Sequence, residues 1–125
     1  MSVIDDDLNK IHEVIALYQK AHYHADPDAL ERAFHPEAQI TGHYKGKSAV
    51  TRRGDYKDVL LRGKSAAACG EASYTRILMI DRTATTALVK VQSLMRGDVF
   101  ISMLTLWKVT TGNWQIISGV FHLDS

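Results

Sequence analysis

The 125-residue sequence has one cysteine, two prolines and little net charge. Cys69 alone cannot form an internal disulfide, which excludes a disulfide-stapled secreted scaffold and favours a reducing, cytoplasmic setting. The formal net charge is +1, and basic residues do not alternate with aromatic ones along any segment. Because nucleic-acid binding needs a concentrated positive field, we expect no nucleic-acid partner.

Long apolar runs are also missing. No run approaches the ~20 residues that a membrane-spanning helix requires, and the acidic N-terminal segment lacks the apolar core of a signal peptide. We therefore expect no membrane partner. No internal repeat, linker or low-complexity segment interrupts the chain, and its length suffices to bury a core. The sequence thus predicts a single domain over residues 1–125.

Motifs for metals, phosphates and nucleophilic serines are absent as well. There is no glycine-rich phosphate loop and no serine nucleophile elbow. His22 and His24 would point about 200° apart on a helix, so they cannot share an ion. Cys69 has no neighbouring histidine or second cysteine. The sequence predicts no metal site and no cofactor.

The strongest pattern present is a C-terminal β-hairpin. Two apolar runs are joined by Thr110-Thr111-Gly112-Asn113, and glycine and asparagine favour a tight turn. A turn centred on Thr111 and Gly112 places Ser102 opposite Phe121. One predicted face carries Phe100, Ser102, Leu104, Leu106, Ile117, Gly119 and Phe121. The other carries Ile101, Met103, Thr105, Trp107, Ile116, Ser118, Val120 and His122. Neither face is that of a solvated surface, so we expect both to be covered.

Three helices are predicted before most of the strands. Residues 5–25 place Leu8, Ile11, Ile15, Tyr18 and His22 on one helical face. Asp26-Pro27 starts a second helix to about residue 34, because aspartate caps and proline fits the first turn. A third helix is expected from residue 48 to residue 61, with Tyr56, Val59 and Leu60 directed inward.

Further strands are predicted over residues 38–44, 74–81 and 86–95. A Gly97-Asp98 turn then leads into the hairpin and would place Ser93 opposite Ser102. Helices first and strands last indicate an α+β protein. We expect three N-terminal helices on one face of a curved antiparallel sheet of four to six strands.

This order of elements resembles the nuclear transport factor 2-like superfamily, whose members form a cystatin-like cone around a deep pocket. The matching segments are Tyr18 to Leu30 through Asp26-Pro27-Asp28-Ala29, then Phe34-His35-Pro36-Glu37-Ala38, and Gly112-Asn113-Trp114-Gln115-Ile116. The end of the chain is most similar to the small "putative lumazine-binding", or SnoaL-like, branch. Because this fold hosts dehydratases, isomerases, cyclases and binders, the resemblance specifies the fold more than the function.

The resemblance implies that the hairpin face with Ser102 lies inside. A small apolar or aromatic ligand is then expected in a pocket formed by Tyr18, His22, Gly42, Tyr56, Leu60, Ser93, Met95, Ser102, Leu104, Gly119 and Phe121. Sheet-to-sheet homodimers are also implied. The predicted interface on the outer hairpin face is Met103, Thr105, Trp107, Ile116 and Val120, with Trp114 as a further candidate. The alternative cover for that face is the N-terminus or a loop of the same chain.

The same resemblance bears on catalysis. In ketosteroid isomerases of this fold, a tyrosine on the first helix donates a hydrogen bond to the oxyanion. That tyrosine lies eight residues before the aspartate that opens the second helix. Tyr18 and Asp26 match that spacing, whereas Ser102 and Gly42 stand where the isomerases carry carboxylates. Steroid-isomerase chemistry by that route is therefore not expected. The lumazine-like branch often carries an aspartate at the position of Ser102 and a lysine at that of Gly119.

Three functional hypotheses follow. The first is a homodimeric small-molecule binding protein. The second is a cofactor-independent enzyme, either a dehydratase (a lyase) or an isomerase. It would act on a small hydrophobic, aromatic or carbonyl substrate. In it Tyr18 would be the oxyanion donor and His22 the general acid/base, because histidine titrates near neutrality. The third is an interaction module with a vestigial pocket. The two missing charges at Ser102 and Gly119 favour binding.

Overall fold

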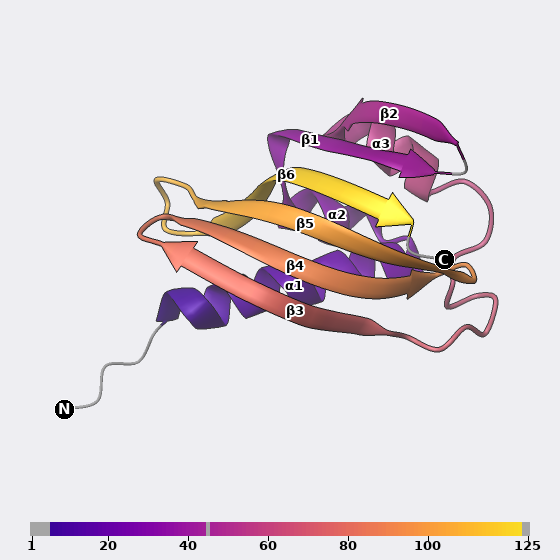
Figure 1. Cartoon of the computed structure of the whole chain (residues 1–125), viewed down its shortest axis with the longest axis horizontal. Coiled ribbons are helices and arrows are strands. Elements are labelled where there is room, and N and C mark those ends of the chain that lie inside the picture. The colour runs from indigo at the N-terminus through magenta and orange to yellow at the C-terminus, as the bar shows by residue number, and fades with distance from the viewer. Residues whose placement is uncertain (1–5, 45, 124–125) are drawn as a thin grey trace.

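The computed structural model describes residues 6–44 and 46–123. Three helices and six strands make up this part of the chain (Figure 1). The helices are α1 (Asp6–His24), α2 (Pro27–Ala33) and α3 (Arg53–Leu60). The strands are β1 (Phe34–Tyr44), β2 (Lys47–Arg52), β3 (Thr75–Thr83), β4 (Thr86–Met95), β5 (Asp98–Lys108) and β6 (Trp114–Leu123).

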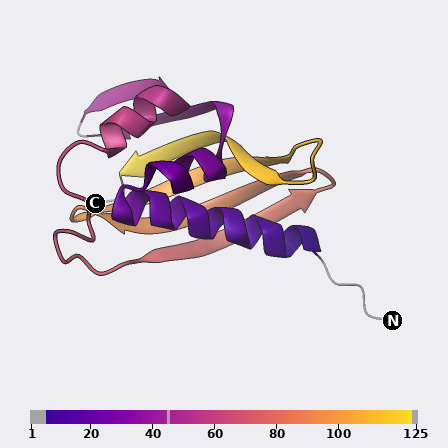
Figure 2. The same ribbon diagram turned by 180° about the vertical axis from the view of Figure 1, so that it is seen from behind.

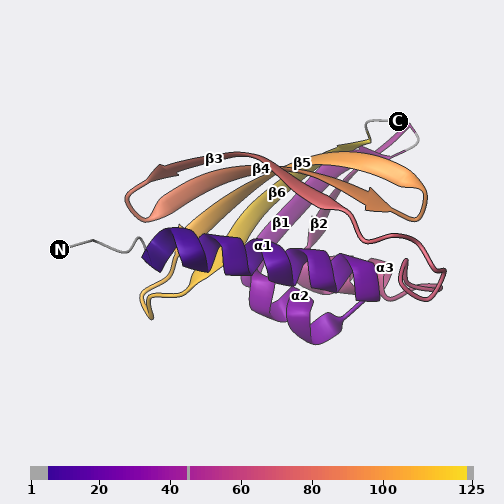
Figure 3. The ribbon, with the colours of Figure 1, turned by 90° about the horizontal axis from the view of Figure 1, so that it is seen from below.

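All six strands form one sheet in the order β2-β1-β6-β5-β4-β3. Neighbouring strands run antiparallel except β1 and β6, which are parallel, so the sheet is mixed rather than wholly antiparallel as predicted. The helices cover one face of the sheet, with α1 lying across it (Figure 2). Seen along its edge, the sheet curves over α1 and leaves its other face open (Figure 3). The α+β class and the helix-covered curved sheet are confirmed.

The core forms where α1 meets the inner sheet face. Residues spaced three or four apart on a helix share a face, and Ile11, Ile15 and Tyr18 are buried in this way. Leu8 was also expected inside, but it lies in the first turn of α1 and is partly exposed. Asp26 caps α2, because its carboxylate accepts hydrogen bonds from the N–H groups of Asp28 and Ala29.

The predicted third helix is wrong over its first five residues. Residues 48–52 belong to β2, which pairs antiparallel with β1 from Gln39↔Arg52 to Tyr44↔Lys47. Val50 and Thr51 are β-branched and suit a strand, and the exposed edge of β1 supplies the backbone partners. The helix therefore begins at Arg53, and Gly54 falls in its first turn rather than its interior.

The turn between β4 and β5 differs by one position from the prediction. It consists of Arg96 and Gly97, both at positive φ, and Met95 pairs with Asp98. Ser93 therefore lies opposite Phe100 instead of opposite Ser102, which pairs with Val91. Because moving a turn centre by one residue changes the pairing by two, every side chain keeps its predicted face.

The prediction that Ile116 lies on the outer face is also wrong. Ser102 pairs with Phe121 as predicted, but a β-bulge interrupts the β5–β6 register between Thr105 and Leu106. The bulge inserts one extra residue on β6, so Ile116 pairs with Leu106 on the inner face. Both side chains are 0% exposed. Trp114 is buried as well, and its Nε1 donates to Asp7 Oδ1 at 3.0 Å.

Candidate functional site

A cavity of about 220 Å³ opens between helices α1 and α3 and the inner face of β4, β5 and β6. Its lining residues are Tyr18, Tyr56, Val59, Leu60, Ser93, Met95, Arg96, Phe100, Ser102 and Phe121. Val59 and Arg96 are exposed and mark the mouth, whereas Tyr18 and Ser102 are buried and mark the deep end. Apolar walls with a few polar groups are typical of small-molecule sites.

Three hydroxyl groups meet at the deep end of the cavity. Tyr18 on α1 donates a hydrogen bond from Oη to Oγ of Ser102 on β5, at 3.3 Å. Burial raises the pKa of the Tyr18 hydroxyl, and its hydrogen bonds with Ser102 and Ser93 partly offset that rise. Tyr18 is therefore a neutral phenol at physiological pH, and it can donate its one O–H to an acceptor atom of a ligand in place of Ser102.

His22 lies directly behind Tyr18, one helical turn further along α1, and is buried. Its Nδ1 is 2.8 Å from the backbone oxygen of Tyr18, and its Nε2 is hydrogen bonded to Oη of Tyr56 on α3. Because a carbonyl oxygen only accepts, Nδ1 carries the proton and Nε2 accepts from the Tyr56 hydroxyl. Burial lowers the pKa of His22 to about 4, although the bond to the Tyr18 carbonyl opposes this shift. The imidazole is neutral near pH 7.

Tyr56 connects His22 to the cavity. Burial raises the pKa of its hydroxyl, and the neighbouring Tyr18 hydroxyl raises it further. The ring centroids of Tyr18 and His22 are 4.3 Å apart, and those of His22 and Tyr56 are 5.6 Å apart. Helices α1 and α3 thus form one aromatic wall of the cavity, in which both phenols are protonated.

The family was established by comparison with known proteins. A family model described as "Putative lumazine-binding" matches residues 6–122. The chain belongs to this family. Among proteins of curated function, no match was found.

Several solved structures have the same fold as this chain. A nuclear transport factor 2-like protein of unknown function from Silicibacter pomeroyi is 23% identical with a TM-score of 0.86, covering 98% of this chain and 99% of that one. One from Methylobacillus flagellatus is 29% identical with a TM-score of 0.81, covering 99% and 97%. A ketosteroid isomerase-like protein from Erwinia carotovora atroseptica is 17% identical with a TM-score of 0.74, covering 98% and 99%. The expected superfamily is confirmed.

Most of the residues predicted for the pocket of this family member surround the hollow. Seven line the cavity itself: Tyr18, Tyr56, Leu60, Ser93, Met95, Ser102 and Phe121. Leu104 and Gly119 line an adjoining hollow of about 20 Å³, less than the share of one water in liquid. A Cβ on Gly119 would lie 3.1 Å from Leu104 Cδ2, so Leu104 takes up much of the space that this glycine leaves.

Two predicted pocket residues lie behind the cavity wall. His22 is screened by Tyr18 and Tyr56, to which it is hydrogen bonded. Gly42 is buried against Phe121, and a Cβ at Gly42 would lie 2.6 Å from the Phe121 ring. This glycine therefore seats the ring of Phe121, which is itself a lining residue.

Three lining residues were not predicted: Val59, Arg96 and Phe100. Phe100 could have been found, because strand alternation places it on the same face as Ser102. Val59 was expected to point inward, and it does so only at the mouth. Arg96 lies in a turn, and no local pattern indicates which way a turn side chain points.

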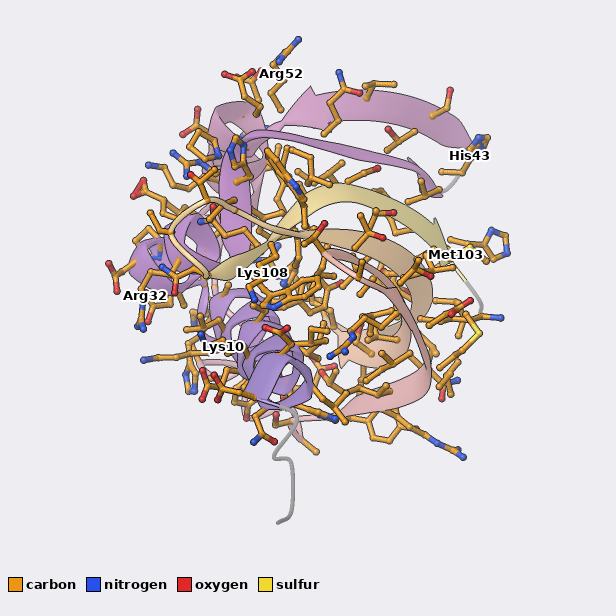
Figure 4. All side chains as sticks on the ribbon, turned by 90° about the vertical axis from the view of Figure 1, so that its left-hand side faces the viewer. Lys10, Arg32, His43, Arg52, Met103 and Lys108 are labelled. Atoms are coloured by element: carbon orange, nitrogen blue, oxygen red, sulfur yellow. The ribbon has the colours of Figure 1, made fainter. Side chains whose placement is uncertain are left out.

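A larger groove of about 510 Å³ lies at the other end of α1, beside α2 and the β5–β6 turn. Lys10 and Arg32 stand on its rim on one side of the molecule (Figure 4). Lys10 donates to the Gly112 carbonyl and pairs with Asp6, and Glu13 and Glu31 also line the groove. Its charged lining of both signs makes it a weaker site for a small apolar molecule.

The outer face of the sheet carries four of the five predicted interface residues. Met103, Thr105, Trp107 and Val120 are exposed there, and Figure 4 shows Met103 and His43 pointing away from the helices. Strand pairing places an apolar row across this face, with Val50, Val120, Met103 and Met79 separated only by Thr41 and Lys90.

No group of three or more His, Cys, Asp or Glu side chains within 6–44 and 46–123 is placed to hold a metal ion. In the same part of the chain, no helix is both long enough and apolar enough to cross a membrane.

Proposed function

We propose that the protein binds a small, mostly apolar or aromatic molecule in the cavity of about 220 Å³. The observation that carries this proposal is an apolar hollow with hydroxyl groups only at its buried end. Leu60, Met95 and Phe121 supply the apolar wall, and at the bottom Tyr18 can turn its hydroxyl hydrogen from Ser102 to a ligand. A ketone, ester or phenolic oxygen of the ligand would accept that hydrogen bond. The ring or chain of the ligand would displace water from the apolar walls.

Binding is favoured over catalysis because the cavity lining lacks a ready base. None of the described lining residues is a carboxylate or a histidine. His22 uses both ring nitrogens in hydrogen bonds, and its pKa of about 4 makes the imidazole a poor proton acceptor near neutrality.

Acetophenone is a suitable first probe, since it combines one carbonyl oxygen with one ring. We expect saturable shifts of cavity resonances in two-dimensional NMR. Val59→Trp should abolish them, because Val59 is exposed at the mouth and a larger side chain there obstructs entry without disturbing the core. Val50→Trp is the matched control, an equally large change on the outer sheet face, and should bind normally. Absence of saturable binding by the wild-type protein would contradict the proposal and favour an interaction module.

The second candidate function is a cofactor-independent lyase or isomerase. The observation in its favour is Tyr56, which lines the cavity and donates a hydrogen bond from its hydroxyl to His22. A proton taken from a ligand by Tyr56 could be matched by transfer of the Tyr56 proton to His22, while Tyr18 stabilised the oxyanion.

This candidate predicts proton abstraction next to a carbonyl group. Cyclohexanone in D₂O should exchange its α-hydrogens faster with wild-type protein than with His22→Gln, as followed by proton NMR. Tyr18→Phe should slow the exchange as well. Equal rates with and without protein would eliminate the enzymatic function for this class of substrate.

We further propose that the apolar row on the outer sheet face pairs with the same row of a second copy. Val120 is 50% exposed and Met103 is 48% exposed, and Trp107 is exposed on the same face. Methionine and aromatic side chains are typical of the centres of protein interfaces. Light scattering should report a dimer that Met103→Lys weakens. Leu61→Lys is the control, because Leu61 is an exposed apolar residue beside α3. A monomeric wild-type protein at 100 μM would refute the dimer.

A cytoplasmic location remains part of the proposal. Its support is the exposed thiol of Cys69, which a reducing compartment would protect from intermolecular disulfides.

A further inference from the structure

The cavity is lined by one charged side chain among the residues that the structure describes. That residue is Arg96, at the mouth; the other nine lining residues are apolar or carry hydroxyl groups. A cation at the mouth of an otherwise uncharged hollow favours ligands with a negative charge at the end that remains nearest to solvent.

The backbone at Arg96 is unusual for an arginine. Arg96 and Gly97 form the two-residue turn between β4 and β5, with φ angles of 52° and 84°. Turns with two positive φ angles favour asparagine or aspartate followed by glycine. An arginine in this conformation costs on the order of 1 kcal/mol or more.

The Arg96 side chain is already held in position. Its Nη2 donates to the backbone oxygens of Leu60, at 3.2 Å, and Arg62, at 3.1 Å. These bonds tie the guanidinium to the end of α3, beside the cavity mouth. They engage Nη2, which belongs to both two-nitrogen edges of the guanidinium, so neither bidentate edge is left open. Nε and Nη1 carry the three other N–H donors of the group, and each nitrogen can donate a single charge-assisted hydrogen bond to a carboxylate oxygen.

No acidic residue lines the cavity to neutralise Arg96. The nearby Glu71 accepts a hydrogen bond at Oε1 from the backbone N–H of Gly97, at 3.2 Å, and so is directed to the turn backbone. Asp98 follows the turn and is not among the lining residues. Arg96 is therefore the one charge that the described lining presents to a ligand.

From these contacts we infer that the ligand is a small aryl or alkyl carboxylate, whose apolar body fills the cavity and whose carboxylate meets Arg96. An acceptor oxygen at the far end of the molecule meets Tyr18. The cavity volume corresponds to roughly seven waters, enough for one ring with short substituents. This inference rests on the proposed binding function and names the class of ligand.

The test compares acids with their neutral amides at two lengths. The probes are 4-acetylbenzoate and 3-(4-acetylphenyl)propanoate, each paired with its carboxamide and titrated by calorimetry. In at least one pair we expect the acid to bind about tenfold more tightly than the amide, as for a charge-assisted hydrogen bond. That preference should shrink at high salt.

Arg96→Asn is the decisive variant. Asparagine followed by glycine is the favoured sequence for this turn, so the variant should fold, while the positive charge is removed. We expect the acid-to-amide ratio to fall to about one, with amide affinity little changed. Arg96→Lys keeps the charge but not the planar guanidinium that the Leu60 and Arg62 carbonyls hold, and it should retain part of the preference. If Arg96 only ties α3 to the turn, acid and amide affinities fall together and the ratio stays constant.

The outcomes separate this inference from the binding function. If acid and amide bind the wild-type protein equally at both lengths, the carboxylate class is wrong and the binding function stands. If acetophenone and all four probes fail to bind, the binding function itself is wrong, and the inference fails with it.

Discussion

The hydroxyl of Tyr56 on α3 donates a hydrogen bond to Nε2 of His22 on α1. This contact joins two helices that are separated in the chain by α2, β1 and β2. His22 therefore bonds the Tyr18 backbone through Nδ1 and the Tyr56 phenol through Nε2, and burial keeps its imidazole neutral.

Stability should fall as pH decreases from 7 to 5, because of His22. Its pKa is about 4 in the folded protein and near 6.5 when unfolded, so between these values the unfolded state binds more protons. The stabilisation is fully present above pH 6.5 and is lost as pH falls toward 4. We expect the loss from pH 7 to pH 5 to exceed that of His22→Gln by about 2 kcal/mol, measured by urea unfolding. Parallel pH profiles for the two proteins would show that His22 is not buried neutral.

Gly42→Ala should destabilise the fold by about 1–3 kcal/mol. The added Cβ would lie 2.6 Å from both the ring and the backbone oxygen of Phe121, so β6 must shift. Gly54→Ala is the matched control, since a Cβ at this helical position meets nothing within 4 Å. It should stabilise by about 0.4–1 kcal/mol through reduced backbone freedom in the unfolded chain. Thermal unfolding of both variants measures the difference, and equal melting temperatures would contradict the close approach at Gly42.

Ile116→Ala should destabilise by about 2–5 kcal/mol, because it deletes a fully buried side chain opposite Leu106. Val120→Ala, four residues later on the same strand, should change the stability of the monomer by no more than about 0.5 kcal/mol, since that side chain is half exposed. Chemical denaturation at low protein concentration checks both. A small effect at Ile116 would mean that the bulge in β6 is misplaced.

The two tryptophans should report opposite faces of the sheet. In Trp107→Phe, the remaining Trp114 is buried and should emit at shorter wavelength with little quenching by iodide. In Trp114→Phe, the remaining Trp107 is 42% exposed and should be quenched readily. If the outer face forms the dimer, quenching of Trp107 should decrease as protein concentration rises. Quenching that does not depend on concentration would argue against Trp107 as an interface residue.

Much of the site was predictable because it depends on local periodicity. The helical spacing places Tyr18 and His22 on the buried face of α1, and strand alternation places Ser102 opposite Phe121. The predicted register at Ser93 was wrong by two residues, yet its face was correct, since a shift of two preserves the alternation. Ile116 was misplaced because a bulge breaks that alternation by one residue.

The sequence by itself determined which side chains share a face, and hence the α+β class and most of the cavity lining. Tertiary structure alone decided the parallel pairing of β1 with β6, the conversion of residues 48–52 into a strand, and the engagement of His22 by Tyr56. Only the folded chain also brings Arg96 to the cavity mouth. These features depend on backbone and side-chain partners distant in the chain, whose free energy of interaction outweighs local preference.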